Sequence, residues 1–131
     1  MSTSVSKKHS QTDILDRFKR SVIQFIDDLI DIFPQESDLI IARVFFDDQI
    51  PIVSIANGFV THVIPHREMI SKRNEKFFLE NNNIFGMIDN GRVLRFKKLW
   101  TSSLLDKDDR EVIWTYFDAF ITLIDAYTNS R

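Results

Sequence analysis

Two long stretches of this chain, residues 11–33 and 106–127, place an apolar side chain at every third or fourth position. This spacing gathers the apolar side chains on one face of an α-helix, whereas a half-buried strand would alternate at every second residue. The stripes consist of Leu15, Phe18, Val22, Phe25, Leu29 and Phe33, and of Ile113, Phe117, Phe120, Ile124 and Tyr127. Both stretches are therefore predicted to be long amphipathic helices that share one core.

The region between them is predicted to hold four shorter helices, at residues 37–46, 52–63, 65–79 and 92–101. Only three glycines and three prolines occur in 131 residues, and this scarcity favours helices over a loop-rich β-fold. Residues 39–46 are rich in strand-forming residues and could also form a strand, but no turn signal divides them. Residues 84–90 are the least certain stretch. The fold class expected is all-α: a single-domain, irregular or orthogonal bundle of five to six helices with two long terminal amphipathic helices.

The first ten residues are expected to form a tail that is flexible or ordered by a partner, and residues 11–131 to form the helical domain. The tail is polar, with Lys7 and Lys8, and no apolar stretch follows it, so it is not expected to be a secretory signal. No apolar run is long enough for a membrane span. Helix 106–127 is expected to begin at Asp106, with Asp109 and Glu111 near its start.

No combination of residues in the sequence matches a known catalytic or metal-binding motif. The chain has no cysteine, which excludes thiol nucleophiles, disulfides and nearly all structural zinc sites. His62 and His66 have the i,i+4 spacing that can chelate zinc, but Pro65 lies between them and there is no HExxH motif. No glycine-rich phosphate loop and no nucleophile elbow is present. We therefore predict a non-enzymatic protein without a metal or cofactor.

Charge is segregated along the chain. Residues 27–48 carry seven acids and one base, and residues 67–98 carry eight bases and four acids. These segments could simply be two solvated faces of opposite sign, or they could be docking surfaces. The candidate acidic docking face consists of Asp27, Asp28, Asp31, Asp38, Asp47 and Asp48. The candidate basic face, for a protein partner or for nucleic acid, consists of Arg67, Lys72, Arg73, Lys76, Arg92, Arg95, Lys97 and Lys98.

Two observations weigh against nucleic acid as the main partner. The formal net charge is −2 with a pI near 5.9, whereas DNA-binding domains are usually basic overall. The two rings interleaved with the basic residues, Phe96 and Trp100, have the i,i+4 spacing of core residues.

Several segments together resemble small α-helical proteins of large double-stranded DNA (nucleocytoplasmic) viruses. The segments are FPQESD at 33–38, IPHREMI at 64–70, KFFL at 76–79 with NNIF at 82–85, FKKLW at 96–100 and IWTYFDAF at 113–120. These are core and cap residues, so the resemblance assigns no functional residue. It implies a minor virion component, associated with the capsid, or an assembly component, with other proteins such as the capsid or a second copy as partners. It also implies a location in the virion or in the host cytoplasm or nucleus. The alternative is a helical nucleic-acid-binding domain that acts on viral DNA.

Overall fold

The computed structural model describes the backbone of residues 3–80 and 90–130, and all regular secondary structure within these ranges is helical. The α-helices are α1 (Thr3–Ile32), α2 (Ser37–Val44), α3 (Ile52–His62), α4 (Arg67–Ser71), α5 (Glu75–Glu80), α6 (Asn90–Trp100) and α7 (Lys107–Asn129). A π-helical turn, η1 (Phe45–Gln49), follows α2, and a 3-10 turn, η2 (Ile64–His66), precedes α4. The all-α, single-domain prediction with two long terminal helices is confirmed.

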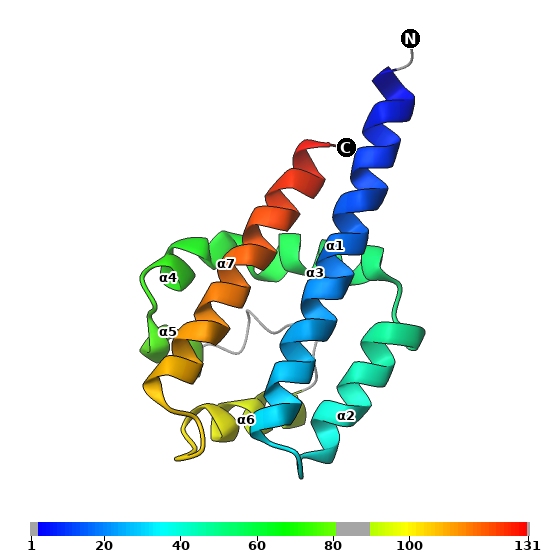
Figure 1. Ribbon diagram of the computed structural model, residues 1–131. Coiled ribbons are helices and arrows are strands. Elements are labelled where there is room, and N and C mark those ends of the chain that lie inside the picture. The colour runs from blue at the N-terminus through cyan, green and yellow to red at the C-terminus, as the bar shows by residue number, and fades with distance from the viewer. Residues whose placement is uncertain (1–2, 81–89, 131) are drawn as a thin grey trace.

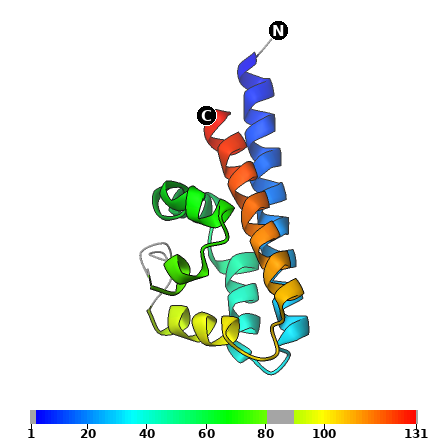
Figure 2. The same ribbon diagram turned by 90° about the vertical axis from the view of Figure 1, so that its left-hand side faces the viewer.

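Helices α1 and α7 lie side by side and antiparallel, and they form one layer of the molecule (Figure 1). The shorter helices form a second layer behind them, as the view turned by 90° shows (Figure 2). Phe25 of α1 contacts the rings of Tyr116, Phe117 and Phe120 of α7, with centroid distances of 5.3, 5.8 and 5.7 Å. The two predicted stripes therefore bury each other, as the spacing requires.

Two apolar clusters make up the core. One surrounds Phe18 and Phe120, where α1 and α7 meet α3, and the other surrounds Trp100 and Trp114, where α7 meets α4, α5 and α6. No polar or charged residue of the described part of the chain is buried. The charged side chains that the structure describes therefore lie at the surface of these helices.

Helix α7 begins as predicted. Asp106 Oδ1 accepts a hydrogen bond from the backbone N–H of Asp109 at 2.8 Å, and Asp109 Oδ2 accepts one from the N–H of Asp106 at 3.2 Å. This capping box satisfies two backbone donors that would otherwise lack a partner at the helix start. Pro51 immediately precedes α3 as its N-cap residue, with φ of −60°.

Helix α1 begins earlier than predicted. We expected its start near Gln11, but the helical backbone extends to Thr3. Residues 3–10 contain neither proline nor glycine, so nothing in their backbone opposes continuation of the helix. This end of α1 projects past the end of α7 (Figures 1 and 2). Ordering of the first ten residues by a partner remains a prediction.

The predicted helix at 65–79 is in fact divided into η2, α4 and α5. The break lies at Arg73, whose φ is 56°. The N–H of Asn74 donates to the carbonyl of Met69, and the N–H of Arg73 donates to that of Ile70, both at 3.0 Å. This is a Schellman motif, which ends α4 with a left-handed residue. Asn74 then accepts a hydrogen bond from the N–H of Phe77 and starts α5.

The remaining helices agree with the prediction to within a few residues. Helix α2 with η1 covers the predicted segment 37–46, and its backbone is helical, not extended. Helix α6 corresponds to predicted helix 92–101. The uncertain stretch 84–90 falls almost entirely outside the described residues. Among the helices described, none is long and apolar enough to cross a membrane.

Candidate interaction surfaces

Three arginines of the candidate basic face, Arg67, Arg73 and Arg95, are paired with acids from distant parts of the chain. Arg67 donates to Asp125 of α7, and Arg95 of α6 donates to Asp38 of α2. Each pair neutralises one cation and one anion locally and joins two helices. These arginines therefore contribute less to an external cationic surface than the sequence alone suggests.

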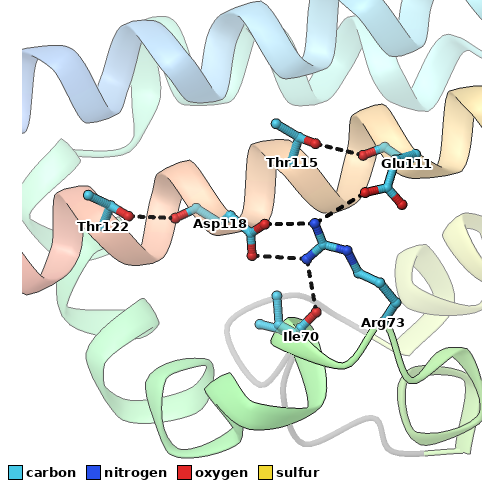
Figure 3. Close-up of polar contacts among 6 residues, drawn as sticks. All are labelled: Ile70, Arg73, Glu111, Thr115, Asp118 and Thr122. Carbon is cyan, nitrogen blue, oxygen red and sulfur yellow. Dashed lines mark hydrogen bonds and ion pairs between the residues drawn. The ribbon is translucent and has the colours of Figure 1, made fainter.

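Arg73 is the most extensively bonded of these arginines (Figure 3). Its Nη1 and Nη2 donate to the two carboxylate oxygens of Asp118 at 3.0 and 2.8 Å, and Nη2 also lies 3.3 Å from Glu111 Oε1. Nη1 additionally donates to the carbonyl of Ile70, and the guanidinium carbon lies 5.9 Å from the centre of the Trp114 ring. The hydrogen bond to Asp118 is the main cause that raises the pKa of Arg73. Arg73 therefore fastens the α4–α5 turn to α7.

Three lysines of the candidate basic face are exposed. They are Lys72 after α4, Lys76 on α5 and Lys98 on α6. No ion pair within the described part of the chain involves these three. Lys97 is half-buried beside Phe96 and Trp100, and the side chain of Arg92 lies outside the described residues. The exposed cationic surface thus rests mainly on lysines.

The negative charge of the candidate acidic face is also partly neutralised by other side chains of the same chain. Asp27 accepts a hydrogen bond from Arg43 Nε at 2.6 Å, and this bond raises the pKa of the Arg43 guanidinium. Asp28 accepts hydrogen bonds from Gln24 and from the Tyr116 hydroxyl. Burial, followed by the bond to Asp28, raises the pKa of Tyr116 to about 12.

Asp31 and Asp48 are exposed, and within the described residues neither carboxylate forms a hydrogen bond or an ion pair. Asp47 is also exposed, and its carboxylate lies 4.0 Å from Arg43 Nη1, at the outer limit for an ion pair. Asp47 and Asp48 are adjacent on η1. This end of the predicted acidic face therefore retains uncompensated negative charge.

An exposed apolar face borders these two aspartates, and we did not expect it from the sequence. It comprises Ile40, Ile41 and Val44 of α2, Phe45 of η1 and the following Ile50, and we call it the α2–η1 apolar face. Ile40, Ile41 and Val44 have 50, 42 and 49% of their surface exposed. Ile50 lies next to Phe45 because its N–H donates to the Phe45 carbonyl at 2.9 Å.

The exposure follows from the position of α2 at an edge of the molecule (Figure 1). Helix α2 buries Leu39 against the core, and its spacing puts Ile40, Ile41 and Val44 on the opposite side. The sequence does indicate this exposure. The segment Ser37–Val44 (SDLIIARV) carries apolar residues around much of the helix circumference, and contact with the core on one side cannot bury all of them.

Two hollows formed by the described residues are too shallow or too small to enclose a ligand. A shallow groove of about 220 Å³ between α1 and α7 has an apolar floor that includes Phe25 and Leu29, with Asp28, Asp31 and Asp109 at its rim. A second cavity, beside Phe78 and Trp114, is only about 20 Å³ and almost wholly apolar.

Among the described side chains, His62 and His66 do not gather with other metal-ligating groups. His66 instead packs on Phe77, with ring centroids 5.1 Å apart. In residues 3–80 and 90–130, no group of three or more His, Cys, Asp or Glu side chains is arranged to hold a metal ion.

Comparison of the chain with protein-family models, with curated proteins and with solved structures found no match.

Proposed function

We propose that this chain is a non-enzymatic structural or interaction protein that docks on another protein through the α2–η1 apolar face. The observation that supports this proposal is the run of half-exposed apolar side chains on one side of α2. Single exposed apolar residues are ordinary, but contiguous ones bordered by charged residues mark interaction surfaces.

The energy available at this face suits a specific contact. Fully burying an isoleucine or valine side chain is worth about 1.5–3 kcal/mol. Ile40, Ile41 and Val44 are already about half-buried, so covering them would contribute roughly 1 kcal/mol each. Such a contribution is enough to anchor a docking contact. Contacts around these three side chains would then exclude water from the interface.

We further propose that the setting is a particle of a large double-stranded DNA virus, with this chain as a minor capsid-associated or assembly component. The resemblance of segments 33–38, 64–70 and 113–120 to small helical proteins of such viruses supports this setting. In purified particles we expect a fixed ratio of this chain to the major capsid protein. Absence of the chain from particles would contradict the virion assignment without affecting the docking proposal.

Site-specific photo-crosslinking tests the docking proposal directly. A photoreactive amino acid replaces Ile41 in the full chain, which is expressed in its native setting before irradiation. We expect one protein partner in high yield. Matched controls carry the same amino acid at Leu104 or Val112, which are also exposed apolar positions but lie outside the α2–η1 apolar face.

Crosslinking restricted to position 41 would support docking through this face. Equal yields from all three positions would contradict it, because the partner would then show no preference for the face. Crosslinks to nucleic acid alone would favour the alternative function.

The alternative is a nucleic-acid-binding domain, which the exposed Lys72, Lys76 and Lys98 favour. Phosphate contacts of this kind predict an affinity for duplex DNA that falls steeply with salt and does not depend on sequence. Lys72→Glu combined with Lys76→Glu should weaken that binding for every DNA sequence tested. Unchanged binding would exclude this face as the DNA contact. Arg73 is unsuitable for this test because its side chain holds the fold together.

A further inference from the structure

We infer that the α2–η1 apolar face receives a basic amphipathic helix, meaning a helix with an apolar stripe flanked by lysine or arginine. The inference rests on the proposed docking function and names the chemistry of the partner. It is drawn from the shape of the face and from the charges that border it.

The shape of the face fits a helix. Ile40, Ile41 and Val44 form a stripe along one side of α2, and Phe45 and Ile50 prolong it. A partner helix covers such a stripe with side chains at i, i+3, i+4 and i+7. The described part of the chain contains no strand, so it offers no sheet edge to which an extended segment could add.

The charge at the border of the face is negative and only partly compensated, because Arg43 and Lys19 also lie beside Asp47. The Asp48 carboxylate has no partner among the described residues, and the Asp47 carboxylate has only the 4.0 Å contact with Arg43. Arg43 itself is held by Asp27. The Lys19 ammonium donates to the backbone carbonyl of Asp47, so it compensates part of the charge there and leaves Asp48 as the carboxylate without an ion pair to another described residue. A partner with flanking cations would gain from both aspartates, whereas a partner with flanking acids would be repelled by them.

The same charges disfavour a second copy of this chain as the occupant. A two-fold contact through this face would use the same patch on both copies. It would bring Asp47 and Asp48 of one copy to the interface that holds Asp47 and Asp48 of the other. Like charges at one interface are destabilising.

Binding of designed peptides to the full chain tests this inference. Three labelled peptides of about five helical turns are compared by fluorescence anisotropy at low and high salt. The first has a leucine stripe flanked by lysine, the second has the same stripe flanked by glutamate, and the third scrambles the first so that its leucines share no face. We expect the lysine-flanked helix to bind at least about tenfold more tightly than either of the others.

Two pairs of variants locate the contact. Ile41→Gln with Val44→Gln, and separately Asp47→Asn with Asp48→Asn, should each weaken binding of the lysine-flanked helix several-fold. Only the double substitution at the two aspartates should also reduce the dependence of peptide affinity on salt concentration. The matched control is Glu68→Gln with Glu80→Gln, which removes two exposed carboxylates from α4 and α5 and should leave binding unchanged.

The outcomes separate this inference from the docking proposal. Equal binding of the lysine- and glutamate-flanked helices would overturn the basic-partner inference and leave apolar docking intact. Binding of none of the peptides would also overturn it, and the crosslinking at Ile41 would then judge docking separately. A concentration-dependent dimer that Ile41→Gln dissociates would overturn it in favour of self-association.

Discussion

Arg73 stands where α4 ends and α5 begins, and its backbone and its side chain act on stability in opposite directions. The left-handed backbone conformation, with φ of 56°, costs a residue with a Cβ atom roughly 1 kcal/mol, whereas glycine adopts it freely. The guanidinium offsets this cost through its paired bonds to Asp118. Its side chain is 29% exposed, so these bonds are less screened by solvent than those of an ordinary surface pair.

Two substitutions at this position separate the backbone from the side chain. Arg73→Ala loses the ion pairs and retains the backbone cost, whereas Arg73→Gly loses the same ion pairs and removes that cost. We expect both variants to be less stable than the native chain, and the glycine variant to be about 1 kcal/mol more stable than the alanine variant. Urea unfolding measures the difference. Equal stability of the two would show that the left-handed conformation carries no cost here.

Because of Tyr116, the unfolding free energy of the protein is expected to depend on pH in the alkaline range. Burial and the bond to Asp28 raise the pKa of Tyr116 from 10.0 to about 12 in the folded protein. The folded state therefore disfavours the phenolate relative to the unfolded state. The resulting stabilisation is complete below pH 10 and is lost as the pH rises from about 10 to about 12.

The substitution Tyr116→Phe removes the ionisable group and so tests this dependence. The difference in unfolding free energy between the native chain and Tyr116→Phe should shrink as the pH rises from about 10 to about 12. Denaturant unfolding at a series of pH values measures this difference. In Asp28→Asn, the phenol absorbance should titrate at a lower pH than in the native chain. Parallel stability curves for the native chain and Tyr116→Phe would contradict the proposed shift.

At the scale of the element, α7 owes its start to the capping box of Asp106 and Asp109. Asp106→Ala removes the acceptor for the backbone N–H of Asp109, and we expect a loss of about 1 kcal/mol. Asp106→Asn should restore most of it, because an amide oxygen can also accept this bond. Asp108→Ala is the control, since it removes an acid from the same turn without a cap bond. A loss from Asp108→Ala as large as that from Asp106→Ala would show that helix-end charge, and not capping, stabilises α7.

Helix α2 shows how an element can be apolar beyond what its own fold requires. Its eight residues bury Leu39 and leave Ile40, Ile41 and Val44 half-exposed. A longer helix could turn one broad stripe inward, as α1 does, but α2 touches the core along one narrow side. The excess apolar surface is what makes α2 a docking element in our proposal.

At the scale of the whole molecule, the two apolar clusters share side chains. Phe25, Ile30, Ile64 and Phe117 pack against both of them. Helices α1 and α7 run through both clusters, so neither can lose its packing without disturbing the other. The molecule is therefore expected to unfold in one cooperative step.

The position of the tryptophans allows a test of this coupling. Trp100 and Trp114 both lie in one cluster, and Ile124 lies in the other. Ile124→Val should destabilise the chain by about 0.5–1.5 kcal/mol. Its unfolding curves by tryptophan fluorescence and by far-UV circular dichroism should shift together. A shift in the circular dichroism curve alone would show that the clusters unfold separately.

The sequence alone predicted the elements whose signals are local. The stripes of α1 and α7 and the helix start at Asp106 act over a few residues, and the structure places helices at each of them. It did not predict the break at Arg73, because a left-handed residue there is usually glycine. The side-chain contacts that hold Arg73 come from α7, far along the chain.

The surfaces were decided by tertiary structure. The arginines at positions 67, 73 and 95 meet acids that lie 58, 45 and 57 residues away, so no local pattern could show that their charge is already paired. The exposure of Ile40, Ile41 and Val44 likewise depends on where α2 sits relative to the core. Periodicity reports which side of a helix is apolar. Only packing determines whether that side finds a partner within the chain or remains open for another molecule.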